Sequence, residues 1–391
     1  MNDDVQRMRE RMKDVEPSEQ GHVWDSLWQD GVTPWDLGHP TPALISEVMA
    51  AEMMMRRGRH NNLATSTTNA TSARFRTTLL PGCGSGYDLV ALAQCFDTMD
   101  AHRKDDDDDD DDDSLSKKNA DAIVSDAHGG RQRRTIVGVD ISSHSLERAK
   151  NVWENHLRMY GPTKTNIQLY RGDFFESPTQ WEPVILPLAE EMASAGTMKN
   201  ATTTTTTITP SIPSNTMAPL EYDLIIDYLF FCALPPSLRL AWGQTISQLL
   251  LSKKDDDDEE EENNEGSASW FSRHPTTPNN DKQLSSFTTT TSRVRTTNPS
   301  LVLTIMFPYY CYNDNDNDDD DPLLNNDESF QSQQRRKVMK GPPYPVCLKD
   351  YQQVLEPFGL RMTKECRGMP YESPDTIPAR RGQEVVAWWT L

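Results

Sequence analysis

The chain has 391 residues, of which 36% are hydrophobic and 25% are charged, and its 39 basic and 60 acidic side chains give a formal charge of −21. Three acidic runs, Asp105 to Asp113, Asp255 to Glu262 and Asp318 to Asp321, hold 21 of the carboxylates, and without them the two signs balance. The net charge therefore describes solvated acidic tracts and predicts no surface for nucleic acid.

Hydropathy and cysteine usage indicate the compartment. No run of 18 apolar residues occurs, and the first twenty residues are charged throughout, so neither a membrane span nor a signal peptide is expected. The six cysteines include no Cys-x-x-Cys pair, which is typical of reduced thiols rather than of zinc ligands. We expect a cytoplasmic protein with no metal and no membrane association.

Segments poor in large apolar side chains interrupt the chain and cannot offset the entropy of folding. The five tracts are approximately 57–74, 97–134, 181–219, 252–299 and 313–337. We predict that residues 1–21 are a disordered N-terminus and that 22–391 form a single domain with the tracts as disordered surface insertions. Each doubling of a loop costs only about 0.6 kcal/mol in closure entropy, so one domain can carry all five.

In the remaining half, short β-branched runs alternate with helical patterns, which favours an α/β fold with a parallel sheet. The expected strands are, in chain order, 77–80, 136–139, 167–170, 223–226, 301–305 and 384–388. Apolar stripes predict one helix over 87–96 and a second one that Ser142 or Ser143 would cap. The stripes are Leu89, Leu92, Ala93 and Phe96, then Leu146, Ala149, Trp153 and Leu157. A further helix is expected over 349–355.

Three tryptophans, Trp24, Trp28 and Trp35, occur within twelve positions near the N-terminus. Aromatic faces attract a cation such as a sulfonium by roughly 0.5 to 2 kcal/mol each and exclude water. The alternative is that all three are packing residues.

The segment Leu-Leu-Pro-Gly-Cys-Gly-Ser-Gly-Tyr-Asp at 79–88 runs from a predicted strand through a glycine-rich turn into a helix. Glycine at Gly82 and beyond lets the backbone approach an adenosine closely, and the helix presents free N–H groups. The glycines follow Gly-x-Gly-x-Gly rather than Gly-x-Gly-x-x-Gly, which disfavours NAD. A plain tight turn is the alternative.

Two acids close the next two strands. Asp140, after Val-Gly-Val, is placed to accept both ribose hydroxyls, and leaving out the tract 97–134 restores its expected distance from the glycine turn. Asp173 and Phe174 follow the third strand, where an adenine would bind. Since ligands of open α/β sheets bind at the carboxyl ends of strands, the sequence predicts an adenosine site there. Asp140 as a helix cap only is the alternative.

Later segments suggest the acceptor side. Asp227 and Tyr228 close the strand in 222–234 and would face the transferred group and its acceptor. The turns at 341–345 and 377–384 are either lids over the acceptor or structural turns. Candidates for the acceptor pocket are Phe307, Tyr309 and Tyr344.

Taken in order, WxxxW, DGVTPWDLG, LLPGCGSGYD, GVDIS, GDFF, DLIIDYLFFCAL, GPPYPV and IPARRGQE resemble the thiopurine S-methyltransferase family, and most closely its thiol and halide methyltransferase branch. The resemblance implies a Rossmann-like seven-stranded class I methyltransferase sheet with helices on both faces, an N-terminal lid and S-adenosylmethionine as cofactor. Carried over by position, the cofactor contacts are Trp24, Trp28, Trp35, Gly82, Asp140, Asp173, Phe174 and Tyr228. Tyr228 and Asp227 are the expected catalytic residues. The insertions, above all 97–134, depart from the family pattern.

The resemblance implies a monomer that transfers a methyl group by in-line displacement to a small-molecule acceptor: a thiol, bisulfide, thiocyanate or halide. A halide, bisulfide or thiocyanate is nucleophilic already, and a thiol needs only partial deprotonation, so the lack of an evident histidine base is compatible with these acceptors. His22 and His39 are expected to be structural or surface residues, and Cys83 a packing residue. A thiopurine-type aromatic thiol is the alternative acceptor. More distant alternatives are an NAD-linked oxidoreductase, whose catalytic dyad is not found, and an acidic scaffold that binds basic partners.

Overall fold

The predicted strands assemble into one mixed sheet in the computed structural model, which describes residues 3–60, 75–106, 133–187, 218–219, 221–251, 300–307, 341–363 and 384–391. The strand order is β4-β3-β2-β1-β5-β6-β8-β7. The strands are β1 (Thr77–Pro81), β2 (Thr135–Asp140), β3 (Asn166–Arg171), β4 (Glu182–Val184), β5 (Leu224–Tyr228), β6 (Leu301–Met306), β7 (Arg361–Met362) and β8 (Val385–Thr390). Strands β1, β2, β3, β5 and β6 are parallel, whereas β4 and β8 pair antiparallel to their neighbours.

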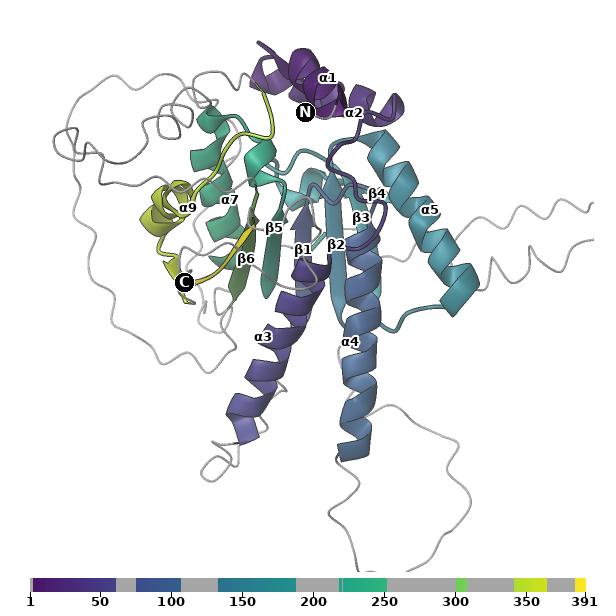
Figure 1. Cartoon of the computed structure of the whole chain (residues 1–391). Helices are drawn as coiled ribbons and strands as arrows, with labels where there is room; N and C mark the ends of the chain where they lie inside the picture. The colour runs from purple at the N-terminus through teal and green to yellow at the C-terminus, as the bar shows by residue number, and fades with distance from the viewer. Residues whose placement is uncertain are drawn as a thin grey trace, which may run out of the picture.

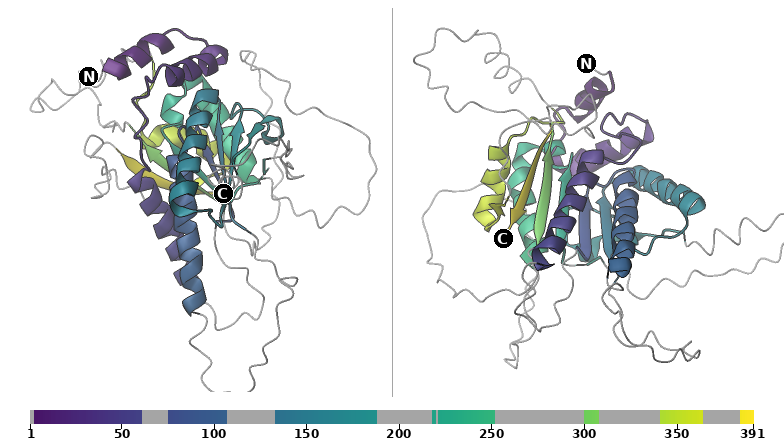
Figure 2. Two further views of the ribbon diagram at one scale, coloured as in Figure 1. Left: turned by 90° about the vertical axis from the view of Figure 1, so that its right-hand side faces the viewer. Right: turned by 60° about the horizontal axis from the view of Figure 1, so that its bottom comes forward.

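Helices cover both faces of this sheet (Figures 1 and 2). They are α1 (Asp3–Met12), α2 (Gln20–Gln29), α3 (Pro42–His60), α4 (Tyr87–Asp106), α5 (Ser143–Tyr160), α7 (Arg239–Leu251) and α9 (Leu348–Leu355). Alternate strand residues face opposite layers: Leu80 packs in the core with α3, α4 and α5, and Leu79 packs in the core with α7 and α9. Helices α1 and α2 lie across the end of the sheet where the parallel strands finish (Figure 1).

The predicted α/β fold is confirmed. All six expected strands are present, the four residues of the first helical stripe are buried in α4, and Ser142 caps α5 by accepting a hydrogen bond from the Ser145 N–H at 3.1 Å. Two strands escaped prediction, since β4 has three residues and β7 has two, too short to show an alternating pattern. The sheet thus contains the seven strands that the family resemblance implies, with β4 added at one edge.

The prediction of a disordered N-terminus is wrong. Residues 3–12 form α1, and Met8 and Met12 are buried in a small core with Leu27 and Val32. The two methionines lie four residues apart and so share one helix face, which is enough to anchor an otherwise charged helix. This core belongs to the N-terminal segment over the sheet edge rather than to the sheet itself.

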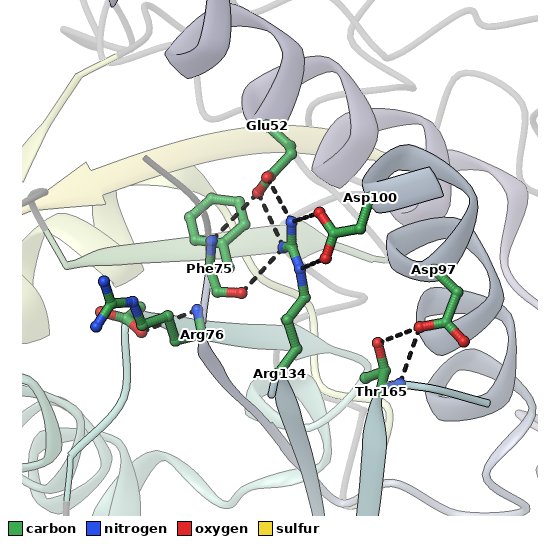
Figure 3. Close-up of polar contacts among 8 residues, drawn as sticks. Glu52, Phe75, Arg76, Asp97, Asp100, Arg134 and Thr165 are labelled. Carbon is green, nitrogen blue, oxygen red and sulfur yellow. Dashed lines mark hydrogen bonds and ion pairs between the residues drawn. The ribbon is translucent and has the colours of Figure 1, made fainter. Parts of the chain in front are cut away.

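The predicted insertion boundaries also need correction, because both sides of the tract 97–134 belong to the fold (Figure 3). Asp97 accepts hydrogen bonds from the N–H groups of Lys164 and Thr165, at 2.5 and 2.8 Å. Arg134, 2% exposed, pairs with Asp100. Likewise α3 continues to residue 60, and β4 lies inside the tract 181–219. Charged helix ends and short strands contain few large apolar residues, so their sequences alone cannot be distinguished from low-complexity tracts. The tracts 252–299 and 313–337 lie outside the described residues.

Candidate functional site

Strands β1, β2 and β3 end side by side. Pro81 pairs with Val139, and Val139 pairs with Tyr170 in the parallel register. The glycine turn, Asp140 and the Gly172-Asp173 segment follow directly after these strands. The three motifs predicted to bind an adenosine therefore share one sheet edge, the usual ligand edge of an open α/β sheet.

The glycine turn requires glycine. Gly82, Gly84 and Gly86 have φ angles of +62°, +52° and +72°, a region that side chains disfavour. A Cβ on Gly86 would lie 2.9 Å from the Ala149 Cβ, so α5 packs directly against the turn. Burial raises the pKa of Cys83 well above its ordinary value, which keeps this thiol neutral and gives it a packing role.

Asp140 joins the turn to the start of α5. Its Oδ2 accepts a hydrogen bond from the Gly84 N–H at 2.9 Å, and its Oδ1 accepts one from the Ser142 N–H at 2.9 Å. Burial raises the pKa of this carboxyl, and the two N–H groups partly offset that. The Ser145 side chain also hydrogen-bonds to this carboxylate. An ionised carboxylate has about four acceptor positions, and acceptors are what the two hydroxyls of a ribose require.

Asp173 and Phe174 lie at the end of β3. The Asp173 carboxylate accepts the Phe175 N–H at 3.0 Å, and its backbone carbonyl accepts the Trp181 indole N–H at 2.9 Å. Phe174 is 4% exposed and packs edge-on against Phe230, with ring centroids 5.2 Å apart. The side chains thus form a fixed aromatic corner beside the turn, and their contact with adenine stays a prediction.

The three predicted tryptophans form one cluster. Trp35 packs edge-on against Trp24 at 5.0 Å and against Trp28 at 5.6 Å between centroids. A Cβ on Gly84 would lie 3.3 Å from the Trp28 ring, which places this ring on the glycine turn. The N-terminal segment therefore brings an aromatic cluster over the edge where Asp140 lies.

Polar contacts that the sequence did not reveal dock this segment on α5. Asp25 accepts hydrogen bonds from the Ser142 hydroxyl at 2.7 Å and the His144 N–H at 3.2 Å. Although partial burial opposes it, these donors lower the pKa of Asp25 to about 2. Asp25 thus supplies a second cap for α5 from more than a hundred residues away, and only the polar Ser-Ser-His run hinted at a partner.

Two further contacts fix the same segment. Asp36 accepts the Ser85 hydroxyl at 2.7 Å, which ties it to the glycine turn. Arg148 donates to the Trp28 carbonyl at 3.0 Å, with its guanidinium 5.1 Å from the centre of the Trp28 ring. Asp36 lies in the DGVTPWDLG segment, but no role was predicted from the sequence for either Asp36 or Arg148.

Tyr228 ends β5 at the same edge and is half-buried. Its hydroxyl donates to Glu384 Oε1 at 2.9 Å, and Glu384 is 1% exposed. This contact fixes the phenol against β8. In the sequence, Glu384 lies at the junction of the turn at 377–384 and the strand at 384–388, and no role in the site was predicted for it.

Asp227 does not face an open site, contrary to the sequence-based prediction. It is fully buried, and both carboxylate oxygens accept the Phe231 N–H, at 3.3 and 3.1 Å. Burial raises its pKa to about 7. Because side chains alternate along a strand, Tyr228 and Asp227 point to opposite faces, and Asp227 holds the loop after β5.

The buried carboxyl predicts a pH-dependent stability. The pKa of Asp227 rises from 3.8 in the unfolded chain to about 7 on folding, so the stability carried by the protonated group is complete below pH 4 and is lost as the pH rises through 7. Asp227→Asn cannot ionise and still accepts the Phe231 N–H. We expect the free energy of unfolding of Asp227→Asn, relative to that of wild type, to increase with rising pH, by at most about 4 kcal/mol at pH 8. Urea unfolding at pH 5 and pH 8 measures this gain, and an equal difference at both values contradicts it.

The acceptor candidates are only partly visible. Phe307 and Tyr344 are half-buried, and Tyr309 and residues 377–383 lie outside the described residues. In the described ranges no group of three or more His, Cys, Asp or Glu side chains is arranged to hold a metal. None of the helices there is long and apolar enough to cross a membrane.

S-Adenosylmethionine fits the donors and acceptors at this edge. Asp140 offers acceptors for the ribose, and the glycine turn gives close access to backbone N–H groups. Phe174 is the ring predicted to lie beside the adenine. The tryptophan cluster is suited to a sulfonium cation.

Comparison with known proteins supports a relationship to the thiol and thiocyanate methyltransferases. The chain is 23% identical to thiocyanate methyltransferase 1 of Brassica oleracea and 26% identical to probable thiol methyltransferase 2 of Arabidopsis thaliana; each alignment covers 58% of this chain and 56% of the relative. The chain thus spans about half the length of these two relatives. Thiocyanate methyltransferase 1 of Arabidopsis thaliana is 20% identical over 94% of this chain and 83% of its own. No family model matches the chain.

Solved structures give weaker likenesses. A magnesium protoporphyrin IX methyltransferase from Synechocystis aligns with a TM-score of 0.37 at 9% identity, over 100% of this chain and 94% of its own. Human N-acetylserotonin methyltransferase aligns with a TM-score of 0.32 at 12% identity, over 81% and 47%. These likenesses add nothing to what the strand order already gives.

The seven-stranded core, the three motifs at one sheet edge and the sequence relatives agree with one another. The chain is a distant homologue of the thiocyanate and thiol methyltransferases and has the class I fold of S-adenosylmethionine-dependent methyltransferases.

Proposed function

We propose that the protein transfers the methyl group of S-adenosylmethionine to a small sulfur nucleophile or a halide. The hydrogen bond from the Gly84 N–H to Asp140, across 56 sequence positions, carries the proposal. It supports a nucleoside site built from the two motifs that the sequence analysis singled out, and the relatives' names favour thiocyanate or a thiol as acceptor.

The bound cofactor supplies an electrophilic methyl group on a sulfonium. The chain's own residues bind it, orient it and exclude water, which is most of what an in-line displacement requires. Trp28, 4% exposed and lying on Gly84, is placed to keep the site dry. No residue needs to form a covalent intermediate.

Tyr228 is the residue that we assign to the acceptor side. Its hydroxyl donates to Glu384 at 2.9 Å, which fixes the orientation of the ring and supports this assignment. Asp227 supports it by holding the following loop rather than by touching substrate.

Calorimetric titration of the purified protein with S-adenosylmethionine tests the first step. Iodide, thiocyanate or bisulfide is then added, and the methylated product is measured, in the headspace where it is volatile. Binding with product establishes the proposed function. Binding without product restricts it to larger thiols, including thiopurines, and a folded sample that fails to bind overturns it.

A further inference from the structure

Arg239 is a buried cation whose guanidinium has no ion-pair partner among the residues that the structure describes. It is the first residue of α7 and is 9% exposed. Its Nε and Nη2 atoms are buried and make no hydrogen bond. Among the described residues it forms no ion pair either. Buried charges in native proteins are normally paired, so an unpaired one requires an explanation.

Arg134, the other buried arginine among the described residues, has a full set of hydrogen-bond partners. Arg134 donates to Glu52, to Asp100 and to the Phe75 carbonyl, at 2.8 to 3.3 Å. Arg239 has no such set, and it lies at a helix N-terminus, where the helix dipole opposes a positive charge. The Phe231 ring, 4.9 Å from the guanidinium, offers a cation–π contact but no hydrogen-bond acceptor, whereas a bound anion would be stabilised by both the guanidinium and the helix end.

The position of Arg239 connects it to the candidate site. Its guanidinium lies 4.9 Å from the centre of the Phe231 ring, and the adjacent Phe230 ring packs against Gly82. The Tyr344 N–H donates to the Cys232 carbonyl at 2.7 Å, which brings the turn at 341–346 beside the same loop. Burial raises the pKa of Tyr344, and the nearby charge of Arg239 partly offsets that.

We propose that Arg239 binds a small monovalent anion and that this anion is the methyl acceptor. The proposal rests on the proposed function and narrows it to anionic acceptors. A guanidinium is weakly hydrated and therefore suits weakly hydrated anions such as iodide and thiocyanate better than an ammonium does. A neutral thiol would leave the charge unpaired.

Chloride NMR tests the site without cofactor or turnover. Wild-type protein is expected to broaden the chloride resonance, and millimolar thiocyanate is expected to reverse this. Arg239→Met keeps the side-chain length and removes an unpaired buried charge, so it is expected to fold, as circular dichroism will verify; Arg239→Gln is a second neutral variant. Both should lose most of the broadening. Arg239→Lys should retain a part, and Arg158→Met, at an arginine that is 59% exposed, should retain it all. Folded neutral variants that broaden the line as wild type does overturn the proposal.

Kinetics then test whether the bound anion is the acceptor. In Arg239→Met the KM for thiocyanate or iodide is expected to rise by about 10-fold to 100-fold, with the KM for a neutral thiol and the affinity for S-adenosylmethionine little changed. Loss of chloride binding with an unchanged KM for anions overturns the acceptor assignment. Failure of the wild-type protein to bind S-adenosylmethionine instead overturns the proposed function. The chloride NMR result does not depend on the cofactor, so the two failures can be distinguished.

Discussion

Asp140→Ala is expected to lower the affinity for S-adenosylmethionine by about 100-fold or more. The variant loses the two acceptor positions assigned to the ribose, and hydrogen bonds to a charged group contribute about 1.5 to 3 kcal/mol each. It also frees the Gly84 and Ser142 N–H groups, which Asp140 holds at 2.9 Å, so the turn loses its preorganised shape. Calorimetric titration with the cofactor measures the change.

Asp97→Ala is the matched control. Asp97 also accepts two backbone N–H groups, those of Lys164 and Thr165, but it does so at the amino end of β3, away from the ligand edge. Both variants are expected to lose a similar amount of stability, and only Asp140→Ala should lose cofactor binding. A folded Asp140→Ala protein with wild-type affinity contradicts the ribose assignment.

The strands and the α/β class follow from sequence periodicity, because buried parallel strands are short apolar runs, whereas the seven-stranded arrangement came from the family resemblance. The same reasoning placed Asp140 beside the glycine turn once the tract 97–134 was set aside, and the Gly84 to Asp140 hydrogen bond agrees with that placement. Binding motifs at the carboxyl ends of strands can therefore be recognised even where a long insertion separates them.

The features that escaped prediction depend on distant partners. Asp25 caps α5 from another segment, and α1 is stabilised by packing of Met8 and Met12 on residues of the N-terminal segment. Asp227 was misassigned because a strand pattern does not say which of two adjacent side chains faces the ligand. Arg134 was assigned to an acidic insertion, although three-dimensional contacts make it part of the core.

Arg134→Met is expected to destabilise the protein by about 3 to 5 kcal/mol, since removing one partner leaves a buried charge uncompensated. The guanidinium pairs with Glu52 at 2.8 Å and with Asp100 at 2.9 Å, and Glu52 is fully buried (Figure 3). Although burial alone would lower it, the hydrogen bonds of these carboxylates raise the pKa of Arg134. Loss of the guanidinium also removes the bond to the Phe75 carbonyl at 3.0 Å.

This network joins the four chain segments at the amino edge of the sheet: α3, the start of β1, α4 and the start of β2. The network therefore holds these four segments together, although they lie far apart in the sequence. The double variant Glu52→Gln with Arg134→Met removes the uncompensated charge and is expected to recover a large part of the loss.

Arg158→Met is the surface control, because Arg158 is 59% exposed and pairs with Glu154 at 3.4 Å within one helix. It is expected to change stability by less than about 1 kcal/mol. Urea unfolding followed by circular dichroism compares all three variants at pH 7. If Arg134→Met costs no more stability than Arg158→Met, the buried network does not hold the four segments together, and the packing of α3 and α4 alone stabilises this edge of the sheet.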